Sequence, residues 1–306
     1  EDAVEVLRRG GLVAIPTETV YGLAADARNA DALARLYAVK GRPGNHPVIV
    51  HIASIEALDG WARDIPDYAR ALAERFWPGP LTLVLKRALP VEGGTPGVLD
   101  AITGGQDTVG LRVPAHPIAK ALLEAWESVA TDVRELPAGL AAPSANRFGR
   151  ISPTSAEHVQ ADLGGDVDLI VDGGPCDVGI ESTIVDCTGE APVILRPGKI
   201  SGEDIAGCTG IDLAQPGAEA PRAPGTLAAH YAPRAKLRML KRSGLIEAVA
   251  VSKGQRLAVL ALEVPVARIS AALSIVVPAV ASSYARTLYA NLRTLDAAGA
   301  DVILVE

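Results

Sequence analysis

The feature that most constrains the fold is an alternation of helical segments with short apolar runs, which continues through most of the 306 residues. Apolar runs at residues 12–15, 48–52 and 81–85 have the length of strands, and segments with helical spacing lie between many of these runs. This order is typical of an α/β fold. Because a domain averages about 150 residues, a chain of this length predicts two domains.

A change in composition marks the expected boundary. Residues 201–235 are rich in glycine and proline and show little apolar periodicity, so we expect a linker there. It would separate a larger N-terminal domain, residues 1–200, from a small domain, residues 236–306. In the latter, short apolar runs at 257–262, 274–277 and 302–305 alternate with helical segments, which predicts a parallel α/β unit.

Charge and cysteine content exclude several classes of protein. The chain carries 29 Lys and Arg against 36 Asp and Glu, so a broad basic surface for stable nucleic-acid binding is not expected. Cys176, Cys187 and Cys208 are odd in number and widely spaced, which indicates reduced thiols in a cytoplasmic protein. The longest uncharged run, residues 269–285, contains Pro278 and is too short to predict a membrane span.

The segment 142–154 concentrates hydroxyl, amide and guanidinium groups. Ser144, Asn146 and Ser152 lie there close to two arginines, but the segment contains no carboxylate and no histidine. Pro143, Gly149 and Pro153 break any regular periodicity, so a shaped loop is expected. Such a loop can bind an anion but has no obvious base. The alternative is an ordinary polar surface loop.

The usual phosphate-binding loops are absent, because the chain contains neither G-x-x-x-x-G-K-[ST] nor G-x-G-x-x-G. Cations and hydroxyls instead follow several expected strands and helices, and such groups neutralise a triphosphate. Each has a simpler explanation: a β-residue, a solvated helix end, or, for Arg112, the partner of a buried acid. The set comprises Thr17, Thr19, Lys40, Arg42, Arg112, Ser144, Asn146, Ser182, Thr183 and Arg196.

Short motifs in a fixed order identify a resemblance. In chain order they are PTETVYGL, KGRP, PVIVHI, FWPGPLTLVL, TVGLRVP, APSAN, SPT, ESTIVD and ILRPG. Together they resemble the threonylcarbamoyl-AMP synthases, and APGTLAAHYAP at residues 223–233 is similar to the linker of the long two-domain form. Each string alone is weakly specific, but their shared order covers essentially the whole chain.

The resemblance implies a YrdC-like domain, in which helices surround a twisted mixed sheet and a large cavity, followed by a small Rossmann-like domain. Family members are nucleotidyltransferases that condense L-threonine, bicarbonate or CO2, and ATP into threonylcarbamoyl-AMP and pyrophosphate. A downstream tRNA-modifying transferase complex uses that product at position 37 of tRNA. The last apolar run is not followed by the C-terminal helix usual in the long form, so we expect the small domain to be incomplete there.

The resemblance also implies site residues by matching motifs. The Lys-x-Arg and Ser-x-Asn signature gives Lys40, Arg42, Ser144 and Asn146 as catalytic residues. Threonine contacts carry over to Thr17, His51, Arg112, Ala142 and Ser182. Nucleotide contacts carry over to Lys40, Thr108, Ser144, Ser152, Arg196 and Tyr231. No residue is implied as a metal ligand, and Mg²⁺ is expected to arrive with ATP.

The implied chemistry explains the missing base. Once the threonine amine has added to CO2 or bicarbonate, its N-carboxylate is the nucleophile, so the protein mainly aligns two anions. Arg112 is expected to bind the threonine carboxylate through its planar fork. Thr17 and Ser182 are expected to contact the amine or hydroxyl. His51, at the end of an apolar run, has the alternative of satisfying a neighbouring carbonyl at a sheet edge.

Two other functions remain open. One is a carbamoyl-transferring enzyme of the hydrogenase-maturation type, which normally brings Cys-rich zinc elements that this chain lacks. The other is an RNA-binding module without catalysis, which the acidic balance disfavours. Pyrophosphate release that requires both threonine and bicarbonate distinguishes the three.

Overall fold

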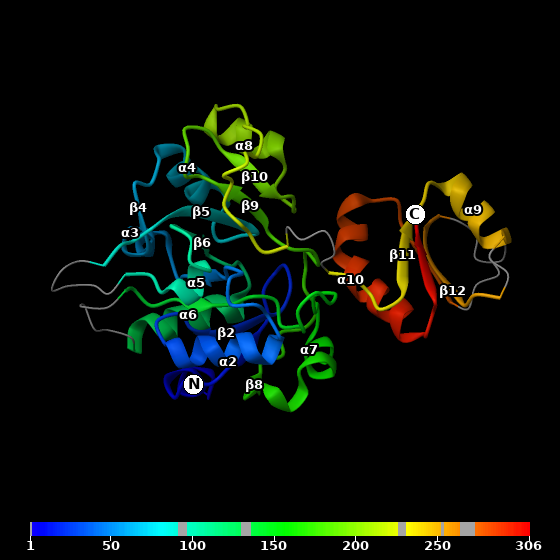
Figure 1. Cartoon of the computed structure of the whole chain (residues 1–306), viewed down its shortest axis with the longest axis horizontal. Coiled ribbons are helices and arrows are strands. Elements are labelled where there is room, and N and C mark those ends of the chain that lie inside the picture. Colours follow the sequence, from blue (N-terminus) through cyan, green and yellow to red (C-terminus); the bar gives the residue numbers. More distant parts are fainter. Residues whose placement is uncertain (1, 91–96, 130–135, 226–230, 252–253, 264–272) are drawn as a thin grey trace.

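The computed structural model describes residues 2–90, 97–129, 136–225, 231–251, 254–263 and 273–306. Its strands form two separate sheets (Figure 1), and we call the part built on each sheet the N-terminal unit and the C-terminal unit. This arrangement confirms the α/β fold with a second, smaller parallel unit. Among the described residues, no helix has both the length and the apolarity required to cross a membrane.

The N-terminal unit is a mixed sheet with the strand order β10-β9-β5-β6-β3-β7-β2-β1-β8, and β4 pairs with β5. The pairs β5/β9, β3/β6 and β1/β8 are parallel, and the other pairs are antiparallel. The strands are β1 (Val13–Ile15), β2 (Gly22–Asp26), β3 (Ile49–His51), β4 (Ala62–Arg63), β5 (Leu81–Arg87), β6 (Thr108–Arg112), β7 (Leu140–Ala141), β8 (Leu169–Ile170), β9 (Thr183–Asp186) and β10 (Val193–Arg196).

Helices cover both faces of this sheet. They are α1 (Asp2–Arg8), α2 (Ala30–Lys40), α3 (Leu58–Trp61), α4 (Asp67–Phe76), α5 (Asp100–Thr103), α6 (Pro117–Val129), α7 (Ala156–Asp162) and α8 (Gly202–Thr209), with 3-10 turns η1 (Ile55–Ala57) and η2 (Gly164–Asp166).

Strand β1 explains the uninterrupted apolar run near the N-terminus. Val13 and Ile15 pack against α1 and α6, whereas Ala14 faces the larger core that contains α2 and α4, so both faces of the strand are buried.

Helix α2 begins and ends where local chemistry predicts. The side chain of Asn29 accepts hydrogen bonds from the N–H groups of Asp31 and Ala32, at 3.0 and 3.1 Å, and thereby caps the first turn. Gly41 follows the last residue with a φ of 60°, in the left-handed region that glycine adopts without steric cost. The helix therefore places Lys40 in its last turn, close to Arg42.

Part of the predicted linker is regular structure. Residues 202–209 form α8, which Ser201 and Asp204 begin with a reciprocal capping box and whose Ile205 is buried in the core of the N-terminal unit. The start of the linker predicted from glycine and proline content is therefore too early, because the chain is still helical as far as Thr209. Leu227 and His230, in the second half of that segment, lie outside the described residues.

The C-terminal unit is an all-parallel sheet with the order β11-β14-β12-β13. Its strands are β11 (Lys236–Met239), β12 (Leu257–Leu262), β13 (Leu273–Val277) and β14 (Val302–Val305), and its helices are α9 (Arg242–Val251) and α10 (Ala281–Ala297). The two helices cover opposite faces of this sheet, and α10 is the helix that faces the N-terminal unit (Figure 1). Val20 and Ile151 of the N-terminal unit share one apolar cluster with Tyr289, Leu292 and Leu295 of α10, so the two units are packed together.

Candidate active site

Most of the predicted site residues line one narrow cavity in the N-terminal unit, with a volume of about 30 Å³. Its walls come from the loop after β1, the loop after β7, the residues before β9, and the ends of β6 and β10. The predicted residues in this lining are Thr17, Arg42, His51, Arg112, Ala142, Ser144, Ser182, Arg196 and Tyr231. Segments that are far apart in sequence therefore meet at one site.

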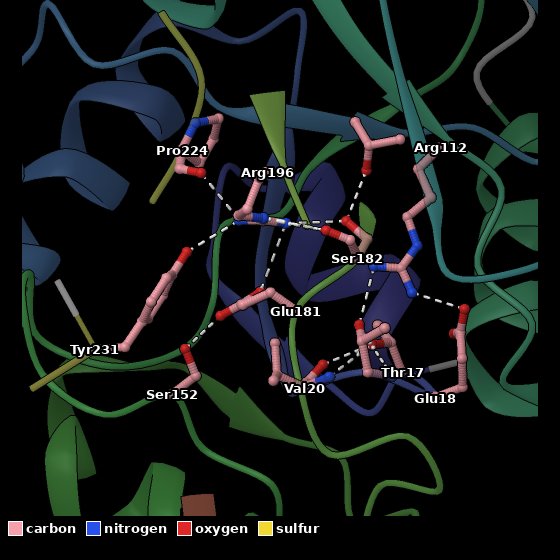
Figure 2. Close-up of polar contacts among 12 residues, drawn as sticks. Thr17, Glu18, Val20, Arg112, Ser152, Glu181, Ser182, Arg196, Pro224 and Tyr231 are labelled. Carbon is pink, nitrogen blue, oxygen red and sulfur yellow. Dashed lines mark hydrogen bonds and ion pairs between the residues drawn. The ribbon is translucent and has the colours of Figure 1, made fainter. Parts of the chain in front are cut away.

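Thr17 builds the turn that forms one wall. Its hydroxyl donates to the carbonyl of Val20 at 2.6 Å and accepts from the N–H groups of Thr19 and Val20, both at 3.2 Å. These bonds fix the turn directly after β1. Thr17 therefore presents its side chain at the cavity as part of a rigid local structure (Figure 2).

Arg112 and Glu18 form a buried ion pair beside this turn. Arg112 Nη2 lies 2.7 Å from Glu18 Oε1, while its Nη1 donates to Thr19 Oγ1 at 2.9 Å. Burial alone would raise the pKa of Glu18, but the charge of Arg112 and hydrogen bonds from Arg112 and the Ala115 N–H hold that pKa below its usual range. Arg112 thus lines the cavity and is also the partner of a buried acid, which was the simpler explanation considered for it from the sequence.

A second network surrounds Arg196 at the opposite wall (Figure 2). Its guanidinium donates to the carbonyl and hydroxyl of Ser182, at 2.9 and 3.0 Å, and to the hydroxyl of Tyr231 at 2.9 Å. Glu181 lies 3.9 Å from Arg196 and accepts a hydrogen bond from the Ser152 hydroxyl. Burial raises the pKa of Tyr231 well above its usual value, so this phenol stays protonated.

Lys40 lies behind the cavity wall rather than in it. Its ammonium donates to the backbone carbonyls of Ser144 and Asn146, and the side chain is only 2% exposed. Burial, with the nearby charge of Arg42, lowers the pKa of Lys40 to about 7. The structure therefore joins the Lys-x-Arg and Ser-x-Asn segments, and here Lys40 holds the loop that carries Ser144.

Asn146 tightens the same loop. Its side-chain amide donates to the carbonyls of Arg147 and Arg150 at 2.8 and 2.9 Å. It is almost fully buried and does not line the cavity. The loop in this part of the chain is thus a built structure, in contrast to the alternative of an ordinary surface loop.

Two buried polar atoms at the cavity have no hydrogen-bond partner among the described residues: Nε of Arg42 and Nδ1 of His51. Burial, together with the charge of Arg112, lowers the pKa of His51 well below its usual value, so His51 is neutral. Leaving a buried donor unsatisfied costs free energy. Unpartnered polar atoms in one cavity are typical of a site completed by a polar ligand.

Thr108 lies in a second, smaller pocket that also includes Gln106 and Gly110. Ile49 and Pro224 line both pockets, so the two are adjacent. Ser152 does not itself line the main cavity in the described structure, but its hydroxyl contacts the carboxylate of Glu181, which does. The predicted residues therefore form three groups. Most line the cavity, Lys40, Asn146 and Ser152 support its wall from behind, and Thr108 lies in the neighbouring pocket.

Some residues of the site were not predicted as such from the sequence. Glu18, Glu181 and Arg293 are not among the residues that the sequence motifs singled out. Arg293 contacts the loop at Ile151 and Ser152 from α10 of the other unit. Their partners are as much as 142 residues away, so no local pattern indicates these contacts.

Comparison with known proteins agrees with this division into two units. The family model described as telomere recombination, Sua5/YciO/YrdC, matches residues 5–198, and the model for the C-terminal domain of threonylcarbamoyl-AMP synthase matches residues 200–306. A threonylcarbamoyl-AMP synthase of Pyrococcus abyssi is 41% identical, over 99% of this chain and 87% of its own length. One of Bacillus subtilis is 44% identical, over 79% of this chain and 66% of its own length.

A solved structure has the same architecture. The crystal structure of P. abyssi Sua5 complexed with L-threonine is similar over 100% of this chain and 87% of that chain, with a TM-score of 0.87 and 40% identity. The similarity therefore extends over both units and the contact between them.

Proposed function

Because the chain belongs to the threonylcarbamoyl-AMP synthase family in its long two-domain form, we propose that it is an L-threonylcarbamoyladenylate synthase, a nucleotidyltransferase. Its substrates would be L-threonine, bicarbonate or CO2, and ATP, and its products threonylcarbamoyl-AMP and pyrophosphate. The observation that carries the proposal is the cavity in which Arg42, Arg112 and Arg196 converge, where Arg42 Nε and His51 Nδ1 have no hydrogen-bond partner within the described part of the chain.

The charges at this cavity favour anionic ligands. Three guanidiniums line it, whereas the two nearby carboxylates, Glu18 and Glu181, are engaged with Arg112 and with Ser152 and Arg196. The guanidinium charge is therefore only partly compensated, and threonine N-carboxylate and ATP are both anions. A low-dielectric, partly enclosed site strengthens such attraction.

We propose positions for two ligands from these contacts. Threonine would lie between the Thr17 turn and Arg112, where hydroxyl acceptors and remaining guanidinium N–H donors meet. The nucleotide would extend from Ser182 and Arg196 toward the adjacent pocket that contains Thr108. This placement brings the amine side of threonine close to the phosphate side of the nucleotide.

The reaction needs no separate base for the phosphoryl step. The threonine amine adds to CO2 and releases a proton to solvent, or adds to bicarbonate with loss of water. An oxygen of the resulting N-carboxylate then forms a bond to the α-phosphorus of ATP. The bond from that phosphorus to the β-phosphate oxygen breaks, and pyrophosphate leaves with its electron pair. Arginines near the phosphates stabilise this charge, and fixed walls align the two reactants.

We propose that Mg²⁺ enters as the Mg²⁺–ATP complex and is held by phosphate oxygens and water. Within the described residues, no group of three or more His, Cys, Asp or Glu side chains is placed to hold a metal ion. Glu18 and Glu181 are already engaged with cations. The donors present therefore fit a cation carried by its nucleotide better than a resident metal centre.

The product is a mixed anhydride, so a group-transferring enzyme must consume it. We propose the downstream tRNA-modifying transferase complex as that consumer, with the cytoplasm as the location. Cys176, Cys187 and Cys208 are all free thiols, as a reducing compartment allows.

The test is pyrophosphate release by the purified chain with each substrate omitted in turn. The proposal requires release that depends on ATP, threonine and bicarbonate together. Release with carbamoyl phosphate in place of threonine and bicarbonate would favour the carbamoyl-transferring alternative. Absence of turnover combined with RNA binding would favour the non-catalytic module.

A further inference from the structure

Helix α10 of the C-terminal unit reaches into the loop behind the cavity through one side chain. Arg293 donates from Nε to the carbonyl of Ser152 at 3.3 Å and from Nη2 to the carbonyl of Ile151. The same guanidinium pairs in a bidentate manner with Asp162, at 3.2 and 2.5 Å. All of these acceptors belong to the N-terminal unit.

The environment of this contact is largely shielded from solvent. The side chains of Arg293 and Asp162 are 14% and 20% exposed. Asp162 is the last residue of α7, where a carboxylate faces the negative end of the helix dipole and is unfavourable unless paired. Arg293 supplies that pairing and, with the rest of its planar fork, holds two consecutive carbonyls.

The held residues connect directly to the cavity. Ser152 donates its hydroxyl to Glu181, and Glu181 lies beside Arg196, which lines the cavity. The next carbonyl in the loop, that of Pro153, accepts from the Tyr21 N–H at 2.9 Å, next to the turn that Thr17 forms. Ser152 is therefore connected to Arg196 by two successive contacts, through Glu181.

A second ion pair between the units offers a comparison. Arg286, also on α10, lies 3.4 Å from Asp177, but these side chains are 53% and 78% exposed. Arg286 contacts no carbonyl of the loop in any described hydrogen bond. If α10 serves only to attach the C-terminal unit to the N-terminal unit, replacing either arginine should affect ATP binding to the same extent. Of the two, Arg293 is the one that contacts the loop that carries Ser152.

We propose that Arg293 is a positioning residue for the nucleotide site: from the C-terminal unit it fixes the backbone at Ile151 and Ser152, and thereby the orientation of Glu181 and Arg196. This inference rests on the proposed function for its choice of ligand. It gives the C-terminal unit a direct part in nucleotide binding, through a contact separate from the linker.

The test uses the full chain and compares Arg293→Ala, Arg293→Lys and Arg286→Ala. We expect Arg293→Ala to weaken ATP binding about 10-fold by calorimetry and to raise the KM for ATP more than the KM for threonine. Arg293→Lys keeps the charge facing Asp162 but cannot hold both carbonyls, so it should not restore ATP affinity. Arg286→Ala should bind ATP within about twofold of the unchanged chain.

Thermal unfolding of each variant separates positioning from attachment. A lower Tm for Arg293→Ala with unchanged ATP affinity and KM, or equal losses in Arg293→Ala and Arg286→Ala, would overturn the inference. Full recovery of ATP affinity in Arg293→Lys would also overturn it, because charge alone would then suffice. If Arg293→Ala does not fold, Arg293→Lys decides the question by the same measurements.

Binding and turnover answer different questions. If the unchanged chain binds ATP but releases no pyrophosphate, the proposed function fails, while an affinity loss confined to the Arg293 variants still supports the inference. If the unchanged chain binds no ATP, both fail.

Discussion

Arg112 and Glu18 are joined across 2.7 Å although 94 residues separate them in the sequence. The pair links the end of β6 to the loop after β1, and each side chain is at most 10% exposed. Nη1 and Nη2 of Arg112 each carry two N–H groups, and each uses one of them for Thr19 or Glu18, so one donor at each nitrogen remains for a ligand. A residue can thus support the wall and still bind a carboxylate.

Replacing Arg112 by lysine tests that double role. Arg112→Lys keeps the charge but loses the planar fork, so we expect the KM for threonine at saturating ATP to rise about 10-fold or more. Steady-state pyrophosphate release measures it. Arg35→Lys is the matched control, because Arg35 makes a bidentate pair with Asp168 at the surface, away from the cavity. An unchanged threonine dependence in Arg112→Lys would leave Arg112 a purely structural residue.

The pH dependence of the free energy of unfolding tests the contribution of Glu18 to the same ion pair. The pKa of Glu18 in the folded chain lies below its usual 4.5, so its contribution to stability is present above about pH 4.5 and is lost as the pH falls through the folded pKa. We expect Glu18→Gln to lower the free energy of unfolding by about 3 kcal/mol at pH 7. The difference from the unchanged chain should shrink as the pH is lowered from 5 to 3. Urea unfolding across this range measures it, and a difference that does not depend on pH would contradict the charge argument.

The cations at the phosphate side give a third prediction. We expect Lys40→Ala and Arg196→Ala each to weaken ATP binding about 10-fold to 100-fold. Arg196→Ala would lose a charge-assisted contact worth about 1.5 to 3 kcal/mol, whereas Lys40→Ala would lose the hydrogen bonds that hold the loop at Ser144 and Asn146. Lys40 would act through the loop at Ser144 and Asn146, whereas Arg196 faces the cavity itself. Calorimetry measures the affinity and circular dichroism checks the fold. Unchanged affinity in both variants would remove them from the nucleotide site.

Motif order and apolar runs predicted much of this structure because a buried strand is a continuous run of apolar residues, which can be recognised in the sequence without knowing the partner strands. Strand β12 has the predicted bounds, and β14 likewise, since both consist of apolar residues in the centre of a parallel sheet. Strand β11 was missed, because Lys236 and Arg238 lie in an edge strand whose four residues are all exposed. An edge strand without a buried face leaves no periodicity to detect.

Prediction of the site from the sequence is limited in the same way, to residues whose signal is local. Thr17, Arg112 and Ser182, which their motifs singled out, line one cavity. The layer behind them depends on pairings across the fold, such as Arg293 with Asp162, 131 residues apart. Nothing in the neighbourhood of either residue in the sequence indicates its partner, because the contact exists only after the two units have packed together.

Close approach of the two units gives a fourth prediction. A Cβ added at Gly179 would lie 2.2 Å from the carbonyl oxygen of Arg286 on α10, and the φ of Gly179 is 74°. Gly179→Ala should therefore separate the units locally and lower the Tm. Gly174→Ala is the matched control, because its φ of 79° carries the same backbone cost while its added Cβ meets nothing within 4 Å. Differential scanning calorimetry compares the two, and an equal loss in both would show that the close approach is unimportant.

The linker lies over the cavity rather than away from it. Arg222 exchanges hydrogen bonds with Gln106, at 2.7 and 3.1 Å, and the Pro224 carbonyl accepts from Arg196 at 3.0 Å. After residues 226–230, which lie outside the described part, the chain returns with Tyr231, whose hydroxyl also contacts Arg196. The remaining cavity volume of about 30 Å³ holds a few water molecules at most, so we expect ATP binding to require movement of the residues over it, Pro224 and Tyr231.

We therefore expect the linker to act as a lid that excludes water from the mixed anhydride product. Removing residues 221–306 should leave an N-terminal unit that binds ATP more weakly and loses its product faster, with circular dichroism confirming its fold. In the full chain, Tyr231→Ala should have a similar but smaller effect. Tyr231→Phe keeps the ring, which lies 6.0 Å from that of Tyr289, and loses only the hydroxyl contact with Arg196, so it should affect ATP affinity least. Product lifetime and threonine-dependent pyrophosphate release measure these differences. If a folded truncation equals the full chain in ATP affinity, rate and product lifetime, the segment is a tether and the cavity closes by other means.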